Sequence, residues 1–173
     1  MCRGDRKAFE EFVNEYQHLV FLCCRTLGLD ADEAEDVASE TFLAAYQKLR
    51  GFRGTSKLST FLWKIAYYKA IDYIRKNKNN NELIGEVDEQ FPDRNFVKTV
   101  AEIENKEQSE AIWLAVKQLP SLWSMAVVLF YRENKSIEEI SKIMEKRKNT
   151  IKIYLFRSRK RLQKLLANFS GEE

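Results

Sequence analysis

One stretch of the sequence, Ser59–Lys78, interleaves aromatic and cationic side chains in a way that suits single-stranded nucleic acid. Each base has a face on which a ring can stack, and each phosphate has a charge that a cation can neutralise. The stretch contains neither glycine nor proline, and its rings scatter around a helix instead of following one stripe, so some rings should lie at the surface. The alternative, which this stretch leaves open, is a buried helix with rings in the core and lysine stems along it. The rings are Phe61, Trp63, Tyr67, Tyr68 and Tyr73, and the cations in or beside the stretch are Lys57, Lys64, Lys69, Arg75, Lys76 and Lys78.

A second basic segment lies near the C-terminus, where residues 142–164 hold ten lysines and arginines against the single acid Glu145. Before it, Ser136 and Glu139 have the spacing of a capping box and predict the start of a short helix. After the polar turn EKRK, Asn149 or Thr150 can cap a longer helix. A short helix, a turn and a longer basic helix are typical of a helix-turn-helix.

The apolar positions of this segment limit which side of the last helix can meet a partner. The residues expected to face inward are Ile137, Ile140, Ser141 and Met144 in the short helix, and Ile151, Leu155, Ser158, Leu162 and Leu165 in the long one. A cationic helix could also bind a membrane surface or only keep the protein in solution. The inward stripe favours a packed helix with a basic outer face, and therefore binding to duplex nucleic acid.

Composition excludes several classes of protein. The chain has 173 residues, of which 45% are hydrophobic and 32% charged, and its net charge is only +3. No apolar run approaches the length of about 18 residues that a membrane span needs, and no signal peptide is visible. Three cysteines, two of them adjacent, favour a reducing compartment and predict a cytoplasmic protein.

The sequence contains no catalytic constellation: no Ser/His/Asp set, no CxxC pair and no glycine-rich phosphate loop. His18 is the only histidine, and although Cys23 and Cys24 follow it, Cys24 should point away from the side shared by the other two. Packed thiols are therefore the better interpretation than a metal site. We expect no enzyme activity, no metal and no cofactor.

Further helices are predicted on either side of a linker. Residues 5–27 carry apolar residues at helical spacing and end at Gly28, and a second helix, capped by Asp30 or Asp32, carries Asp36, Glu40, Leu43 and Gln47 on one face. This acidic face could dock on a basic partner or be an ordinary solvated surface. From Asn77 the segment NKNNNELIGEVDEQFPD is too polar to bury much surface and predicts a linker. Residues 99–118 predict a helix that ends at Pro120.

Two blocks of the chain resemble a known family. AEDVASETFLAAYQKLRGF followed by LSTFLWKIAYYKAIDYIRK looks like the second conserved region of bacterial sigma factors of the extracytoplasmic-function group. LPSLWSMAVVLFYRENKSIEEISKIMEKRKNTIKIYLFRSRKRL resembles the fourth region of that group, including its helix-turn-helix. Several positions depart from the family pattern: Phe61 stands where Trp is usual, Trp63 where Tyr is common, Tyr68 where Asn is usual, and Tyr154 where Arg is frequent.

The resemblance implies a role for each block. The acidic face of Asp36, Glu40, Leu43 and Gln47 would dock on the clamp of the largest subunit of RNA polymerase core enzyme. The minus-ten element of promoter DNA would be recognised and opened by Lys57, Phe61, Trp63, Lys64 and Tyr68. The minus-thirty-five element would be bound by Lys148, Asn149, Thr150, Lys152, Ile153, Tyr154, Arg157, Arg159 and Lys160. The resemblance also implies an anti-sigma factor as a partner, and no membrane insertion.

The sequence therefore predicts an all-α protein with two small helical domains joined by a flexible acidic linker, the second containing a helix-turn-helix. The expected domains are residues 1–78 and 108–170, with the linker at 79–107. The predicted function is that of a sigma factor. The alternatives are a free-standing helix-turn-helix regulator that binds duplex DNA, and an adaptor whose first half binds only another protein.

Overall fold

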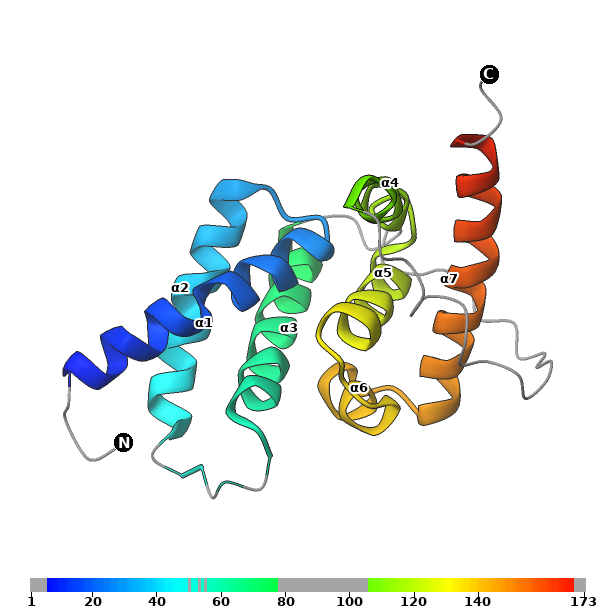
Figure 1. Ribbon diagram of the computed structural model, residues 1–173. Helices are drawn as coiled ribbons and strands as arrows, with labels where there is room; N and C mark the ends of the chain where they lie inside the picture. Colours follow the sequence, from blue (N-terminus) through cyan, green and yellow to red (C-terminus); the bar gives the residue numbers. More distant parts are fainter. Residues whose placement is uncertain (1–5, 50, 53, 55, 78–105, 170–173) are drawn as a thin grey trace. The chain divides into compact units, whose positions relative to one another are not determined.

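The computed structural model describes residues 6–49, 51–52, 54, 56–77 and 106–169, and every regular element in these residues is helical (Figure 1). The predicted all-α fold class is confirmed. The chain divides into two compact units, the first containing α1–α3 and the second containing α4, α5, η2 and α7. The elements are α1 (Arg6–Thr26), α2 (Ala31–Leu49), α3 (Leu58–Asn77), α4 (Lys106–Val116), α5 (Ser121–Val127), η2 (Val128–Arg132), α6 (Ile137–Met144) and α7 (Lys148–Phe169).

The predicted linker at 79–107 lies outside the described residues except for its last two positions, which belong to α4. The helix predicted over 99–118 is described from Lys106 onward, and Ala115, Val116 and Leu119 are buried. Its N-terminal part also lies outside the described residues.

α1 forms because apolar residues recur at helical spacing, and Phe12, Val20 and Cys23 are buried. Its aromatic residues pack on α2: the ring of Phe9 lies 4.8 Å from that of Tyr46, and the ring of Phe12 lies 6.0 Å from that of Phe42. The helix ends just before Gly28, whose φ of +87° is strained for any residue with a Cβ. The predicted stop at Gly28 is confirmed.

Both thiols of α1 are packed in the core. Cys23 and Cys24 are each 0% exposed, whereas His18 is exposed, so the packed-thiol interpretation is confirmed. Burial raises the pKa of Cys23 well above its usual value and raises that of Cys24 to about 12. Both thiols are therefore protonated, and unreactive, at neutral pH.

α2 begins with a reciprocal cap that decides between the two predicted cap residues. The backbone N–H of Glu33 donates to Asp30 Oδ1 at 2.9 Å, and the backbone N–H of Asp30 donates to Glu33 Oε2 at 2.8 Å. Asp30, not Asp32, is the N-cap residue, and Glu33 closes the capping box. The cap fixes the start of the helix that carries the acidic face.

α3 packs against both other helices of the first unit, and its buried side includes two alanines among larger residues. Ala66 and Ala70 are 0% exposed and Ile74 is 4% exposed, and Trp63 lies on the same stripe, three residues before Ala66.

The second unit contains a short π-helical segment directly after α5. The backbone N–H of Glu133 donates to the carbonyl of Val128 at 3.0 Å, which is the five-residue spacing of a π-helix. Val128 and Leu129 face the core, whereas Phe130 and Tyr131 lie half-buried with rings 4.9 Å apart. Such segments often lie at functional sites.

The predicted helix-turn-helix is present as α6, a tight turn and α7. Ser136 Oγ accepts from the backbone N–H of Glu139 at 3.2 Å, and the Glu139 carboxylate accepts from the backbone N–H of Ser136 at 2.9 Å, so the predicted capping box is confirmed. Ile151, Leu155 and Ser158 are 0% exposed and form the predicted inward stripe of α7. Ser158 Oγ donates to the carbonyl of Tyr154 at 2.7 Å.

The turn between α6 and α7 depends on Glu145 in the left-handed conformation, with φ 48° and ψ 43°. This conformation costs a residue with a Cβ about 1–2 kcal/mol, which glycine avoids. We therefore expect Glu145→Gly to raise the free energy of unfolding by about 1 kcal/mol after the greater chain entropy of glycine is subtracted. Urea denaturation of the full chain measures the change. The control Glu145→Ala removes the carboxylate but keeps the Cβ, and an equal gain from this variant would contradict the conformational explanation.

Candidate polymerase and nucleic-acid interfaces

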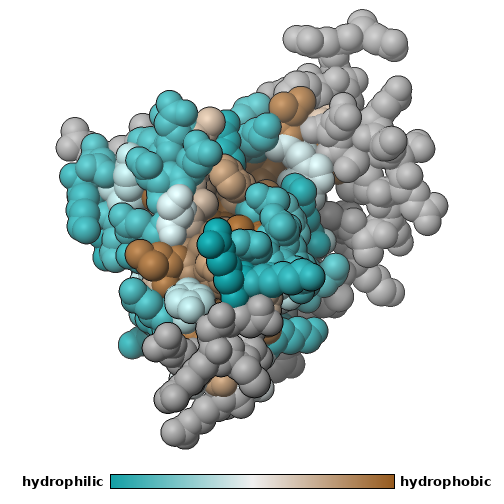
Figure 2. Space-filling model, turned by 90° about the vertical axis from the view of Figure 1, so that its left-hand side faces the viewer, coloured by the Kyte–Doolittle hydropathy of each residue, from teal (hydrophilic) through white to brown (hydrophobic). Residues whose placement is uncertain are grey.

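The four residues predicted to form a docking face on α2 share one exposed side of the helix. Asp36, Glu40, Leu43 and Gln47 are all exposed, and Leu43 is 60% exposed. We call these four residues the α2 face. The opposite side of α2 is buried through Ala34, Val37, Ala38, Thr41, Phe42 and Ala45. Figure 2 shows a face of the molecule that is largely hydrophilic, with small apolar areas exposed among the polar side chains. A leucine kept in water beside two carboxylates gives the α2 face both apolar and charged groups for a partner.

Glu40 of the α2 face also makes an ion pair with α3. Its Oε2 accepts from Lys69 Nζ at 2.9 Å, with 65% of the Glu40 side chain and 36% of the Lys69 side chain exposed. The hydrogen bond and charge of Lys69 hold the pKa of Glu40 below its usual value, so Glu40 is ionised at neutral pH. The pair is solvated and adds little to stability. The charge of this acid is therefore available to a partner.

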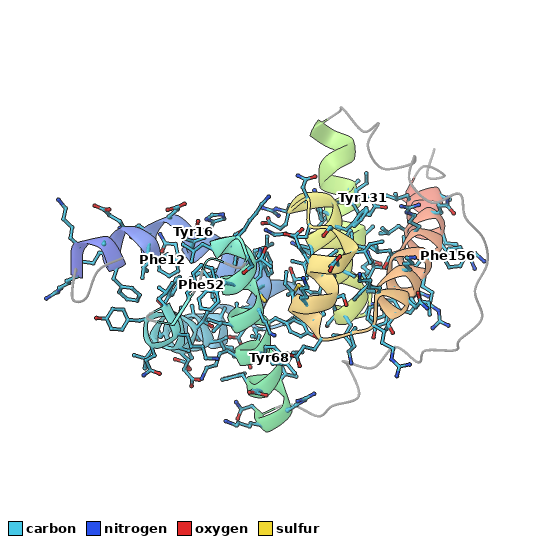
Figure 3. All side chains as sticks on the ribbon, turned by 90° about the horizontal axis from the view of Figure 1, so that it is seen from below. Phe12, Tyr16, Phe52, Tyr68, Tyr131 and Phe156 are labelled. Atoms are coloured by element: carbon cyan, nitrogen blue, oxygen red, sulfur yellow. The ribbon has the colours of Figure 1, made fainter. Side chains whose placement is uncertain are left out.

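The residues predicted to bind the minus-ten element divide by burial. Lys57 and Lys64 are exposed, and Phe61 and Tyr68 are half-buried. The Phe61 ring packs against that of Phe52, with centroids 4.8 Å apart. Lys64 Nζ lies 5.8 Å from the centroid of the Tyr68 ring, which Figure 3 labels beside α3 and whose hydroxyl is buried. Exposed cations and half-buried rings therefore lie together on one side of α3, a combination that occurs in sites for single-stranded nucleic acid.

Trp63 is the exception: it was expected to lie at the surface and to contact the minus-ten element, and it is buried. Its ring is 0% exposed, and its Nε1 is buried without a hydrogen-bond partner among the described residues. The reason is its place on the buried stripe of α3, with Ala66 and Ala70 three and seven residues further along. Tyr67, at 4% exposure, is also buried. A ring without exposed surface cannot stack on a base in this conformation, so the core interpretation holds for Trp63.

On α7, the residues predicted to read base edges are only partly accessible. Lys148, Asn149 and Lys152 are exposed and Thr150 is half-buried, all within the N-terminal turns of the helix. Lys148 Nζ lies 3.3 Å from Glu138 Oε2 of α6, and both side chains are more than half exposed. This pair joins the two helices of the helix-turn-helix beside the expected reading position.

Ile153 and Tyr154 differ from the prediction. Ile153 is 8% exposed and Tyr154 is 3% exposed, so neither offers a surface to DNA in this conformation. An isoleucine has no hydrogen-bonding group for a base edge and gains free energy from burial. Tyr154 is three residues from Ile151 and borders the inward stripe, and burial raises the pKa of its hydroxyl. Their assignment as DNA-binding residues is therefore corrected.

Three cations further along α7 lie against aromatic rings. The Arg157 guanidinium lies 5.9 Å from the Trp123 ring, that of Arg159 lies 5.7 Å from the Tyr131 ring, and Lys160 Nζ lies 5.1 Å from the Phe156 ring. Arg159 Nε also donates to the Tyr131 hydroxyl at 2.7 Å. Lys160 is exposed, whereas Arg157 and Arg159 are half-buried.

Sequence reasoning missed the partners of these cations. Tyr131 and Arg159 are 28 positions apart, and no spacing rule links a residue of η2 with one of α7. The ion pair of Glu138 with Lys148 could have been suspected, because Glu138 lies in the first turn of the short helix and a basic turn follows that helix. Tyr46 was also missed: it is 38% exposed near the α2 face.

Two features bear on other classes of function. Among the described residues, no group of three histidine, cysteine, aspartate or glutamate side chains is placed to hold a metal ion. Within the same residues, no helix is both long and apolar enough to span a bilayer.

Comparison with known proteins agrees with this geometry. Residues 12–80 match the sigma-70 region 2 family, and residues 109–162 match the sigma-70 region 4 family. The chain is 33% identical over 172 residues to the ECF RNA polymerase sigma factor SigW of Bacillus subtilis, covering 95% of this chain and 91% of that protein. It is 31% identical to the RNA polymerase sigma-H factor of Pseudomonas aeruginosa, covering 95% of this chain and 89% of that protein.

Solved structures share the fold. The structure of CnrH in complex with the cytosolic domain of CnrY superposes with a TM-score of 0.63 at 17% identity, over 95% of this chain and 91% of that one. The sigma factor RpoE of Bartonella quintana, in complex with the anti-sigma factor NepR, gives a TM-score of 0.62 at 21% identity, over 96% of this chain and 99% of that one.

The two regions, in this order and on one chain, define a sigma-70-type initiation factor. This chain belongs to the extracytoplasmic-function group of RNA polymerase sigma factors. It confers promoter recognition and transcription initiation on bacterial RNA polymerase core enzyme, and the alternative of a free-standing regulator is not favoured.

Proposed function

We propose that the work of initiation is divided among three surfaces of this chain. The α2 face docks on the clamp of the largest polymerase subunit, the exposed side of α3 binds the minus-ten element, and the helix-turn-helix binds the minus-thirty-five element. The proposed domains are residues 1–78 and 108–170, and the proposed linker is 79–107. The division is supported by where the structure leaves charged and apolar groups in solvent.

The observation that carries the docking assignment is the exposure of Leu43. Leu43 is 60% exposed on a helix whose opposite side is well buried, so most of its side chain is left for contact with a partner. Asp36 and Glu40, one turn apart, place negative charge on its N-terminal side. A basic polymerase surface with an apolar centre fits this combination.

The minus-ten assignment now depends on Lys57, Phe61, Lys64 and Tyr68. These four residues place two cations beside two half-buried rings. Bases of an opened strand could stack on the rings while the cations neutralise phosphates. Trp63 supports this side of α3 from the core and is not proposed as a contact.

Regulation and location follow from the family and its relatives. Structural relatives of this chain are bound to anti-sigma factors or to a cytosolic partner domain, and we propose that this chain also has an anti-sigma factor. It acts in the cytoplasm with RNA polymerase and performs no catalytic step of its own.

The minus-thirty-five assignment is tested by two lysines of α7 that differ in position. Lys152 lies one turn into the helix, where a helix-turn-helix meets base edges, whereas Lys160 lies two turns further on. We expect Lys152→Ala to reduce the discrimination between the preferred base and the others by about 1–3 kcal/mol at the position that Lys152 contacts. We expect Lys160→Ala to weaken all sequences alike and to make the salt dependence shallower by about one unit.

Binding selection with holoenzyme on a randomised upstream element measures both effects. Both lysines are exposed, so neither change should disturb folding. If Lys152→Ala selects the same sequence as the parent chain, α7 does not read bases through Lys152, and this assignment fails.

A further inference from the structure

Tyr131 and Arg159 form a cation–hydroxyl pair that joins η2 to α7. Arg159 Nε donates to the Tyr131 hydroxyl oxygen at 2.7 Å, and Arg159 Nη2 donates to the same oxygen. The guanidinium carbon also lies 5.7 Å from the centroid of the Tyr131 ring. Figure 3 labels Tyr131, which comes from η2, in the second unit. A single tyrosine thus contacts the guanidinium through both its hydroxyl and its ring.

Arg159 lies on the side of α7 that carries the exposed lysines of the reading position. Lys148, Lys152 and Arg159 are separated by four and seven residues, so their Cβ atoms project from nearly the same side of the helix. This side borders the inward stripe, because buried Leu155 lies four residues before Arg159, and Arg159 itself is half-buried. The Tyr131 contact therefore acts on a cation that shares its side with the proposed base-reading lysines.

The chemistry of the pair suits phosphate binding. A guanidinium has five N–H donors, so two bonds to one hydroxyl oxygen do not exhaust it. An arginine held in one rotamer loses less conformational entropy when it binds a phosphate than one that is free to move. The tyrosine hydroxyl that accepts these bonds also has a hydrogen of its own to donate.

We propose that Tyr131 is a positioning residue, which holds Arg159 ready for a phosphate oxygen of the promoter duplex upstream of the start site. The proposal rests on the proposed function, in which Arg159 contacts phosphate. Tyr131 then sets how tightly the helix-turn-helix binds DNA and has no influence on which sequence it prefers. The π-helical segment is what places this tyrosine, because its wider turn changes which residues of the segment face α7.

Three variants of the full chain test the proposal in holoenzyme assembled with core polymerase. Tyr131→Phe keeps the ring and removes the hydroxyl, Arg159→Ala removes the cation, and the third variant combines the two changes. A fluorescently labelled promoter duplex and an unrelated duplex are titrated at several salt concentrations. The control Tyr16→Phe removes a tyrosine hydroxyl from α1 of the first unit, which is not proposed to bind the duplex through this residue, and leaves both affinities unchanged.

We expect Arg159→Ala to weaken binding to both duplexes and to make the salt dependence shallower by about one unit. Tyr131→Phe weakens both by about 3- to 10-fold, because Arg159 must then be ordered on binding. In the Arg159→Ala background, Tyr131→Phe changes neither affinity nor salt dependence. Melting temperatures of the single variants stay close to that of the parent.

The possible contrary results point to different errors. If Arg159→Ala binds DNA as the parent does, the proposed phosphate contact is wrong and the role of Tyr131 falls with it. If Arg159→Ala weakens binding but Tyr131→Phe does not, the phosphate contact stands and the positioning role is overturned. Tighter binding by Tyr131→Phe also overturns the positioning role, because the hydroxyl would then hold the arginine away from DNA. An equal loss of affinity with and without Arg159 overturns it too, because the hydroxyl would then act through the fold and not through Arg159.

Discussion

Replacing Trp63 with alanine is expected to lower the free energy of unfolding by about 3–5 kcal/mol. The ring is 0% exposed on the stripe of α3 that carries Ala66 and Ala70, and these small neighbours cannot fill the space that it leaves. A typical domain has a total stability of only about 5–15 kcal/mol, so this loss would be a large share. Thermal melts and urea titrations of the full chain measure the loss.

Phe61→Ala is the matched comparison, because it removes another ring from the same helix. Phe61 is half-buried and packs on Phe52, so the expected loss of stability is smaller, about 1–2 kcal/mol. Phe61→Ala should instead reduce opening of the minus-ten element, which permanganate footprinting of the holoenzyme–promoter complex detects. Normal stability with failed strand opening in Trp63→Ala would show that Trp63 binds DNA after all.

Reversing the charge of the α2 face is expected to weaken binding to core polymerase by about 30-fold or more. Asp36→Lys with Glu40→Lys turns an attraction to a basic surface into a repulsion, and like charges across an interface cost several kcal/mol. Both acids are exposed, and the Glu40–Lys69 pair is solvated, so the change in folding stability should stay within about 1 kcal/mol. A titration of labelled core enzyme with each variant measures the affinity.

The control for this experiment has the same change in net charge at other exposed positions. Glu11→Lys with Glu35→Lys alters one acid on α1 and one on α2 outside the α2 face. If docking is local, this variant binds core nearly as the parent does. An equal loss from both double variants would mean that overall charge, not the α2 face, controls association. Leu43→Ala separately tests the apolar centre of the face, with circular dichroism confirming the fold.

Much of the fold could be predicted from the sequence because local signals decide it. The stop at Gly28 and the box of Ser136 and Glu139 depend on neighbours within a few residues, and both predictions are confirmed. The inward stripe of α7 follows from helical spacing alone. The acidic face of α2 was also predictable, since polar residues at these spacings can lie only on the side away from the buried alanines.

The burial of individual side chains could not be predicted where packing partners come from distant segments. Scattered rings on α3 indicated surface exposure, yet Trp63 is buried on the same side of the helix as two buried alanines. Those alanines, three and seven residues further on, were the available signal. Ile153 lies off the inward stripe, and spacing gave no warning that it is buried. The Tyr131–Arg159 contact joins residues 28 positions apart and has no sequence signature.

The two capping boxes have a consequence for the thermodynamics of assembly. Asp30 with Glu33, and Ser136 with Glu139, fix the first turns of α2 and α6 in the unbound chain. α2 is already packed along its buried side, so docking of the α2 face requires no coupled folding of that helix. The heat-capacity change on binding core enzyme through this helix should then reflect only the apolar area that the two surfaces bury. Folding of a disordered segment on binding gives a larger, more negative heat-capacity change, which is not expected for docking through α2.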